Sequence, residues 1–243
     1  MSILEELMET LRGDAPVRAV LVGAHWTAVC SRNCGLASTL LDDKPHGEAQ
    51  VRQAGRLTDL SAREMAALAR SGCLLEASIG VAAINSLLDV DEERMVEVNA
   101  GEVLARHGQG KKVALVGHFP FIPALRQAAS LLWVIEQHPA EGEYGAEAAR
   151  ELIPQADVVA MTGTTLINHT LDGLLALCRP QALVMLLGPS TPLSPVLFNH
   201  GVSLLSGVRV VDEEAVMRTV GQGATLRQVE GVRLLTMARQ GVW

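Results

Sequence analysis

Small polar residues gather in one short segment that could hold an anionic group. Thr162, Gly163, Thr164 and Thr165 follow an apolar run and precede a candidate helix, and Asn168 lies one turn further on. Backbone N–H groups at the start of a helix, together with hydroxyl groups, can bind carboxylate or phosphate oxygens. A threonine in this place can also cap the helix without binding any ligand. Both interpretations are open, although three threonines and a glycine exceed what a cap requires.

Two further loops carry hydrogen-bonding residues in comparable positions. They contain Gly117, His118 and Phe119 in the first case, and Gly188, Pro189, Ser190 and Thr191 in the second. The prolines of the second loop fix its backbone, so Ser190 is expected to bind a ligand or to support the turn. Ser190 is not in a G-x-S-x-G context and no base is evident, which disfavours a nucleophilic role.

Glu136 occupies the place of the ribose-binding acid in a dinucleotide-binding fold. It lies 19 residues after Gly117, at the end of an apolar run, where such an acid binds a hydroxyl group. The G-x-G-x-x-G sequence is absent, so dinucleotide binding of the usual kind is disfavoured. The alternative interpretation is an ordinary carboxylate at a strand end. His118 and His25 are the candidates for an acid or base in such an enzyme.

Cysteines and histidines offer a weaker signal for a metal ion. Cys30 and Cys34 could place two thiolates on one ion, with His25 as a further candidate ligand. Structural zinc sites normally show a second matched pair, which is missing, and His118, His138 and His169 form no spacing motif with the cysteines. Buried cysteines without a metal are the alternative expectation.

The elements that must position these residues alternate regularly after residue 111. Short apolar runs predict parallel strands at 112–116, 131–135, 157–161, 182–187 and 202–205. Helices are predicted between and after them at 122–129, 144–152, 166–177, 213–220 and 225–239. This alternation predicts a Rossmann-like, doubly wound and mainly parallel sheet, in which ligands bind beyond the carboxyl ends of the strands.

The first 110 residues show a different pattern. Apolar residues at helical spacing predict a helix at 3–11, and strands are predicted at 17–22 and 27–30. A polar loop follows at 42–55, and two helices are predicted at 61–70 and 78–88. Ser61 with Glu64 forms a capping-box pattern for the first of them. We therefore expect an α+β domain at 1–110 and a Rossmann-like domain at 111–243.

Composition narrows the class of function. The chain has 243 residues, of which 49% are hydrophobic and 19% charged, and a net charge of −7. An acidic protein with 3% aromatic residues is poorly suited to nucleic acid. The sequence shows no secretory signal and no apolar run long enough to span a membrane. We expect a soluble cytoplasmic protein that binds neither nucleic acid nor membranes.

Several segments together resemble a known family. They are GAHWTAV at 23–29, CGLA at 34–37, ASIGVAAINSLL at 77–88, TGTTLIN at 162–168 and GPSTPL at 188–193. The chain resembles the "putative heavy-metal chelation" family, whose function is unknown. The resemblance implies an N-terminal domain similar to the capping domain of enolases, then a Rossmann-like domain, with a shared cleft. It also implies that the cleft is lined by His25, Gly35, Leu36 and Asn85 together with the loops at 117–120, 162–168 and 188–191.

Three functional hypotheses follow. The leading one is a protein that binds, and processes or carries, a small anionic metabolite or a metal-chelating compound in this cleft. In it, a transition or heavy metal ion is held by the small molecule. The second is an enzyme that uses a nucleotide or an S-adenosyl compound. The third is a carrier that binds a free metal ion through Cys30, Cys34 and His25. Catalytic residues stay unassigned, and a homodimer is the default assembly.

Overall fold

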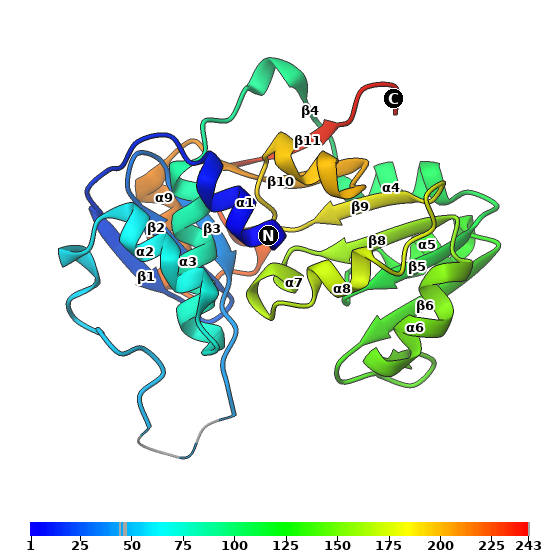
Figure 1. Cartoon of the computed structure of the whole chain (residues 1–243), viewed down its shortest axis with the longest axis horizontal. Coiled ribbons are helices and arrows are strands. Elements are labelled where there is room, and N and C mark those ends of the chain that lie inside the picture. Colours follow the sequence, from blue (N-terminus) through cyan, green and yellow to red (C-terminus); the bar gives the residue numbers. More distant parts are fainter. Residues whose placement is uncertain (44, 46–47, 243) are drawn as a thin grey trace.

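The computed structural model describes residues 1–43, 45 and 48–242. In this part of the chain the strands form a small sheet of three strands and a large sheet of eight. Figure 1 shows the small sheet with α2 and α3 at one end of the molecule and the large sheet at the other. Residues 44, 46 and 47 of the predicted loop at 42–55 lie outside the described residues. The fold is a mixed α/β fold, as the sequence predicted.

The large sheet has a doubly wound centre. Its strands are β4 (Met95–Glu97), β5 (Lys112–Val116), β6 (Leu131–Glu136), β7 (Tyr144–Gly145), β8 (Val158–Thr162), β9 (Leu183–Leu187), β10 (Leu204–Val210) and β11 (Val232–Ala238), in the order β4-β11-β10-β9-β8-β5-β6-β7. From β7 to β10 all neighbours are parallel, whereas β11 is antiparallel to both β10 and β4. Strand order reverses between β5 and β8, because β6 and β8 both pair with β5, one on each side.

Helices cover both faces of this sheet. They are α4 (Ala100–Gly108), α5 (Ile122–Ala128), α6 (Ala149–Leu152), α7 (Thr164–Ile167) and α8 (Leu171–Leu175). Alternate residues of a strand point to opposite faces. Val113 and Leu115 of β5 accordingly pack in the cluster that contains α4 and α5, and Ala114 between them packs with α6 and α7. Burial of both faces explains why the parallel strands are almost continuously apolar.

The small sheet packs on a deeply buried helix. Its strands β1 (Ala19–Val22), β2 (Trp26–Cys30) and β3 (Cys34–Ser38) are antiparallel neighbours. Helix α3 (Leu74–Leu87) lies on one face, with α1 (Ile3–Thr10) and α2 (Ala62–Ala66) nearby. Gly35 lets β3 approach α3 closely, because a Cβ atom there would lie 2.2 Å from the Ala82 carbonyl oxygen. Glycine is therefore required at this crossing.

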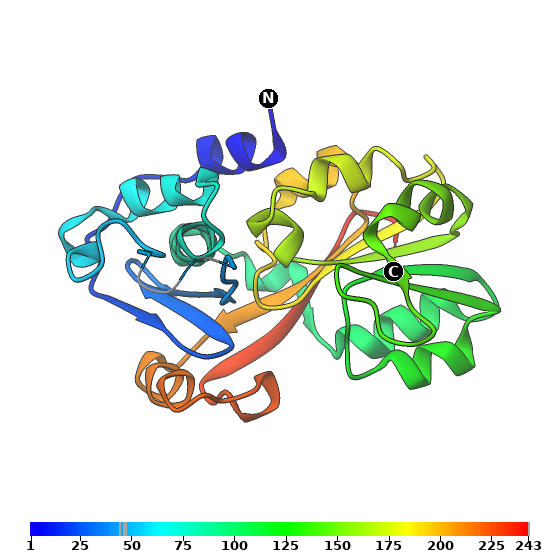
Figure 2. The same ribbon diagram turned by 90° about the horizontal axis from the view of Figure 1, so that it is seen from below.

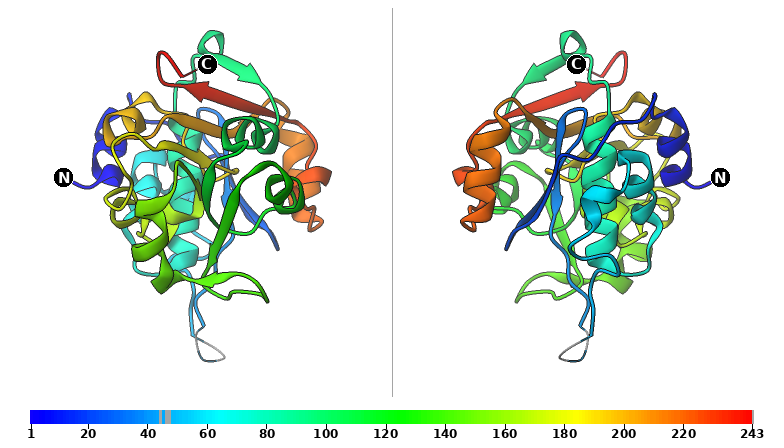
Figure 3. Two further views of the ribbon diagram at one scale, coloured as in Figure 1. Left: turned by 90° about the vertical axis from the view of Figure 1, so that its right-hand side faces the viewer. Right: turned by 90° about the vertical axis from the view of Figure 1, so that its left-hand side faces the viewer.

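The last part of the chain returns to the small sheet. Strands β10 and β11 extend from the large sheet towards it, and α9 (Glu213–Gly221) lies on the face opposite α3 (Figure 2). Val216 and Val220 of α9 pack with Ala28 and Leu36 in one buried cluster. Helices α1 and α9 consequently lie on opposite sides of the molecule (Figure 3). The division into 1–110 and 111–243 stays a prediction. Strand β4, from the first segment, belongs to the large sheet, α4 packs on that sheet, and α9, from the second segment, packs on the small sheet.

Local signals in the sequence fix several element ends. Ser61 accepts a hydrogen bond from the Glu64 backbone N–H, and the Glu64 carboxylate accepts one from the Ser61 N–H. Ser2 and Glu5 form the same reciprocal arrangement at α1. A capping box satisfies two backbone donors that a helix start otherwise leaves unpaired. The predicted capping box at Ser61 is confirmed.

The five predicted parallel strands are confirmed, but the sequence interpretation was wrong elsewhere. The predicted helix at 225–239 is instead a single 3-10 turn (Leu226–Gln228) followed by β11. Strands β3, β4 and β7 were not predicted, and the predicted helix at 166–177 is broken into α7 and α8 around His169, which has a positive φ of 58°. Short apolar runs do not distinguish a strand from a helix, and the partner strand decides.

The remaining described helical segments are short 3-10 helices of three to six residues. They are η1 (Leu57–Asp59), η2 (Ala67–Arg70), η3 (Glu92–Arg94), η4 (Ala146–Ala148), η5 (Ile153–Gln155), η6 (Pro195–His200) and η7 (Leu226–Gln228). Among the helices of the described residues, none is long and apolar enough to cross a membrane.

One buried carboxylate anchors a loop to α3. The Glu76 side chain is 4% exposed and accepts hydrogen bonds from the Arg52 backbone N–H, the Arg52 guanidinium and the Ser71 hydroxyl. The Arg52 hydrogen bonds, with Ser71 adding to them, lower the pKa of Glu76 from 4.5 to about 2. A carboxyl group with a lowered pKa stabilises the fold above its unfolded pKa and loses that effect as the pH falls towards the folded value.

We predict that Glu76→Gln lowers the free energy of unfolding by about 1 to 3 kcal/mol at pH 7, because a neutral amide replaces the carboxylate that accepts these charge-assisted hydrogen bonds. Urea unfolding at pH 7 and pH 3 measures the difference. The gap between the wild type and the variant should shrink between pH 4.5 and pH 2. Glu93→Gln, an exposed control, should change stability little at either pH; an equal effect of both variants would contradict the anchoring role.

Candidate functional site

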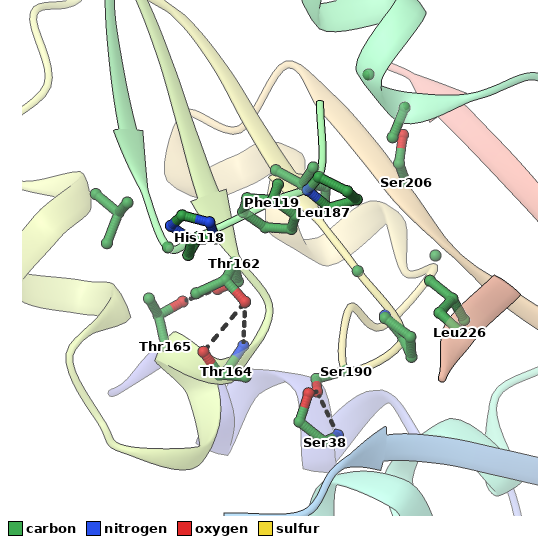
Figure 4. A pocket seen from close by; sticks show the side chains of 18 of the residues that line it. Ser38, His118, Phe119, Thr162, Thr164, Thr165, Leu187, Ser190, Ser206 and Leu226 are labelled. Carbon is green, nitrogen blue, oxygen red and sulfur yellow. Dashed lines mark hydrogen bonds between the residues drawn. The ribbon is translucent and has the colours of Figure 1, made fainter. Parts of the chain in front are cut away.

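A large cleft lies at the carboxyl ends of the parallel strands. Its volume is about 950 Å³, and residues of the small sheet, the large sheet and α4 line it. Trp26 and Ser38 come from the small sheet, and the loops after β5, β8 and β9 form the opposite wall. Figure 4 shows the labelled side chains around it. The cleft includes the point between β5 and β8 where strand order reverses, which is where open α/β sheets bind ligands.

Two glycines shape the strand ends at this point. Gly117 after β5 and Gly188 after β9 have positive φ angles of 110° and 105°. A Cβ atom on Gly117 would lie 3.0 Å from the Thr162 Cβ, so the β5 and β8 ends approach closely. A Cβ atom on Gly188 would meet nothing within 4 Å. Both glycines line the cleft.

Three threonines at the carboxyl end of β8 form a compact hydroxyl cluster. Thr162 Oγ1 accepts hydrogen bonds from the Thr164 backbone N–H at 3.3 Å and the Thr164 hydroxyl at 3.1 Å. Thr165 donates its hydroxyl to the Thr162 carbonyl oxygen at 2.7 Å and is buried. Helix α7 has only four residues, so its dipole contributes little. The hydroxyl groups, rather than a long helix, are the donors at this wall.

Asn168 follows the threonines and also lines the cleft. Its Oδ1 accepts hydrogen bonds from the Thr170 N–H and the Thr170 hydroxyl. Its amide nitrogen donates to no other group among the described residues. The neighbouring His169 points away and places Nε2 3.0 Å from the Ser71 carbonyl oxygen. An uncommitted amide donor therefore remains at the cleft wall.

The loop after β9 joins the two sheets. Ser190 Oγ accepts a hydrogen bond from the Ser38 backbone N–H at 2.8 Å and donates to the Ser38 hydroxyl at 3.2 Å. Asn85 donates its amide to the Leu36 and Pro189 carbonyl oxygens. Ser190 is 1% exposed, so its hydroxyl supports the joint, while the Ser38 hydroxyl keeps its own hydrogen for the cleft.

Not every residue predicted for the site lies on the cleft wall. The predicted residues on the wall are Gly117, His118, Phe119, Glu136, Thr162, Thr164, Thr165, Asn168, Gly188, Pro189 and Ser190. The wall also contains four residues that the sequence did not single out, namely Ser38, Leu40, Asn99 and Arg227. The predicted residues His25, Gly35, Leu36, Asn85, Gly163 and Thr191 lie outside the wall. Asn85 and Gly35 instead connect α3 with the joint. The buried atoms Thr191 Oγ1 and Asn85 Oδ1 have no hydrogen-bond partner among the residues that the structure describes.

The charged groups of the cleft are few. Glu136 ends β6, and its Oε2 accepts a hydrogen bond from the Gln137 N–H at 3.0 Å. Arg227 approaches from η7. His118 lies beside a carboxylate that the sequence did not reveal, with Nδ1 2.8 Å from Glu143 Oε1. Glu143 sits in a turn between β6 and β7, where no local pattern marks it.

Aromatic and apolar side chains form the remaining wall. The rings of Phe119 and Phe121 stack with centroids 5.1 Å apart, and Leu187 and Leu226 border the same space (Figure 4). Helix α5 has a proline in its first turn. The proline removes a backbone N–H donor from the start of α5, and the two rings occupy the loop between β5 and α5. A dinucleotide-binding fold would bind pyrophosphate at this loop.

The predicted metal ligands do not converge. Cys30 and Cys34 are paired residues of β2 and β3 and are buried, whereas Trp26 and Ser38 at the other end of the same hairpin face the cleft. The hydrogen bond with Cys34, followed by burial, raises the pKa of the Cys30 thiol.

The third predicted ligand lies elsewhere. His25 is exposed and precedes the first residue of β2, at the opposite end of the strand from Cys30. Within the described ranges, no three His, Cys, Asp or Glu side chains form a group that could hold a metal ion.

Comparisons with known proteins agree on one family. Two family models described as "Putative heavy-metal chelation" match residues 4–88 and 99–238. An uncharacterized protein from Methanocaldococcus jannaschii is 28% identical over 193 residues, covering 75% of this chain and 72% of that protein.

Two solved structures are similar along almost the whole chain. A protein of unknown function from Desulfitobacterium hafniense has a TM-score of 0.86 at 29% identity, and one from Pyrococcus horikoshii has 0.81 at 20%. Each comparison covers 98% of both chains, and both structures are described as members of the DUF364 family.

We predict that Ser190→Ala weakens the joint between the two sheets. The variant leaves the Ser38 backbone N–H without its acceptor, which should lower the free energy of unfolding by about 1 to 3 kcal/mol. Urea unfolding provides the measurement, with Ser130→Ala as an exposed serine control. Equal stabilities of the two variants would show that the Ser38–Ser190 contact does not hold the sheets together.

Proposed function

From the premise that this chain belongs to the family described as "Putative heavy-metal chelation", we propose that its cleft binds a small anionic metabolite or a metal-chelating compound. The observation that carries the proposal is a surplus of uncommitted hydrogen-bond donors on the cleft wall. Such a wall favours a ligand rich in acceptors, such as carboxylate oxygens. The bound ligand is then either processed or carried.

Three polar groups on the cleft wall keep a hydrogen that they do not donate to another described residue. Thr162 Oγ1 accepts two hydrogen bonds from Thr164, so its own hydrogen is directed elsewhere. The Ser38 hydroxyl accepts from Ser190 and likewise keeps its hydrogen. Asn168 uses only its oxygen within the protein. These three groups, with the Arg227 guanidinium at the cleft, can donate to one acceptor-rich ligand.

A ligand that brings its own metal asks little of the protein side chains. A metal bound directly needs a convergent set of His, Cys or carboxylate ligands, which the described residues do not supply. In our proposal a heavy or transition metal ion is cargo held by the small molecule. The protein would recognise the organic part through hydroxyl and amide groups.

One observation favours a second candidate, an enzyme of nucleoside or S-adenosyl chemistry. Glu136 ends the strand next to β5 and lies at the cleft, in the position from which an acid binds ribose hydroxyls. The phenylalanine rings and the proline in α5 argue against a pyrophosphate group at the same loop. A nucleoside without phosphates would fit this combination. Binding of S-adenosyl compounds would raise the melting temperature of the wild type but not of Glu136→Gln.

We predict that untagged protein retains a small-molecule adduct in native mass spectrometry combined with elemental analysis. Thr164→Val and Asn168→Ala should lose the adduct, because they disturb the donors at the cleft wall. Thr10→Val is the control, since the Thr10 hydroxyl bonds only within α1. No adduct in any sample, and unchanged function of both variants, would count against the proposal. The mass of the intact assembly in the same spectra tests the expected homodimer. We propose that the protein works in the cytoplasm.

The cysteines give a test that separates the cleft from a direct metal carrier. We predict that the double variant Cys30→Ser, Cys34→Ser retains both the adduct and any metal, because the buried thiols lie at the far end of the hairpin from the cleft. Elemental analysis of the double variant and the wild type measures this. A metal that disappears only with the cysteines, and carries no organic component, would favour the carrier.

A further inference from the structure

His118 and Glu143 form a hydrogen-bonded pair with an unusual division of exposure. The His118 side chain is 63% exposed and lines the cleft, whereas the Glu143 side chain is 8% exposed. His118 Nδ1 lies 2.8 Å from Glu143 Oε1, and Glu143 Oε2 accepts a hydrogen bond from the Ala140 backbone N–H at 2.9 Å. The carboxylate is thus held from two sides, and it fixes the imidazole ring.

The pair defines which ring nitrogen carries hydrogen. The Ala140 N–H, with His118 adding to it, lowers the pKa of Glu143, so the carboxylate is ionised near neutral pH. An ionised carboxylate only accepts hydrogen bonds. His118 Nδ1 must therefore be the donor, and Nε2 of the neutral ring keeps its lone pair. No other described residue forms a hydrogen bond with Nε2.

We propose that His118 is the proton-accepting group of the cleft and that Glu143 positions it. This inference rests on the proposed function and adds the chemical class of the ligand: an acceptor-rich molecule that also carries an acidic O–H, S–H or N–H hydrogen. His118 follows Gly117 at the close approach of β5 and β8, and Figure 4 draws His118 and Thr162 among the side chains that line the cleft. The base and the hydroxyl donors therefore face the same space.

The proton transfer balances within the protein and the ligand. The X–H bond of the ligand breaks, its electron pair stays on X, and the proton forms a new N–H bond at His118 Nε2. The Nδ1 hydrogen remains in place, and the adjacent Glu143 carboxylate stabilises the resulting imidazolium. A hydroxyl group must lose its proton in this way before it can act as a nucleophile or as a strong metal ligand.

Two other histidines show that this arrangement is not a general property of the chain. His200 places Nε2 2.7 Å from Glu6 Oε2, and His169 places Nε2 3.0 Å from the Ser71 carbonyl oxygen. Both histidines contact their acceptor through Nε2, whereas His118 contacts its acceptor through Nδ1. Neither lines the cleft. They provide internal references for the tautomer of His118 in the same spectrum.

The test is nitrogen NMR of the full chain labelled with 15N-histidine, at a pH of about 8.5 where imidazole is neutral. His118→Gln identifies the His118 signals. In the wild type we expect the Nδ1–H tautomer for His118 and the Nε2–H tautomer for His169 and His200. An Nε2–H tautomer of His118 in the wild type would overturn the proposal.

Glu143→Gln should reverse the tautomer of His118. The side-chain oxygen of the introduced glutamine would accept the hydrogen bond from the Ala140 backbone N–H, so its NH2 group would face His118 Nδ1. Nδ1 would then have to accept, and the hydrogen of the neutral imidazole ring would move to Nε2. Unchanged His169 and His200 signals show that the variant is folded, and Glu143→Ala tests the same point without a new donor. An Nδ1–H tautomer that persists in both folded variants would show that Glu143 does not position the ring.

Diethyl pyrocarbonate, which reacts with an unprotonated imidazole nitrogen, tests whether Nε2 is presented to small molecules. Peptide mapping should find the label on His118 in the wild type and a rate that falls severalfold in Glu143→Gln. Exposed His138 is the control, and its rate should stay the same in both proteins. Labelling of His138 without His118 would overturn the proposal. Neither experiment needs the ligand, so a missing adduct would refute the proposed function alone.

Discussion

The cleft depends on one joint, the contact between the loop after β9 and the end of β3. Its two walls come from different sheets, so two hydrogen bonds set the distance between the walls. Ser190 Oγ accepts a hydrogen bond from the Ser38 backbone N–H, and the Pro189 carbonyl oxygen accepts one from the Asn85 amide. The Ser190 side chain is buried, and a backbone donor that loses its acceptor in such a place costs free energy. Helix α3 supplies Asn85 and crosses β3 at Gly35. The packing of α3 therefore fixes the geometry of a site that it does not line.

Local patterns were sufficient for the parts of the fold that local physics determines. The parallel strands are apolar because both of their faces are covered, and the Ser61 cap is a contact between residues three positions apart. Strand β11 was mistaken for a helix because its residues 232–238 are decided by pairing with β10 and β4. The sheet order then brought the predicted loops at 117, 162 and 188 to one edge.

The site itself was only partly predictable, since its partners are distant in sequence. The threonines and the Gly188 loop were visible as strand-end residues, but Ser38 enters from the other sheet and Glu143 from a turn. Nothing in the sequence around Glu143 indicates that it meets His118. The predicted Cys30 and Cys34 do pair, yet as neighbours in a buried hairpin. Their spacing reflects the turn between two strands as well as it reflects a metal site.

The return of α9 to the small sheet has a consequence for biosynthesis. Strands β1 to β3 leave the ribosome well before Val216 and Val220 of α9, which cover one of their faces. Until α9 has been synthesised, the nascent chain exposes the apolar face around Ala28 and Leu36. Chaperones that bind exposed apolar surface are expected to hold this face, and prematurely terminated chains keep it open to quality-control proteases.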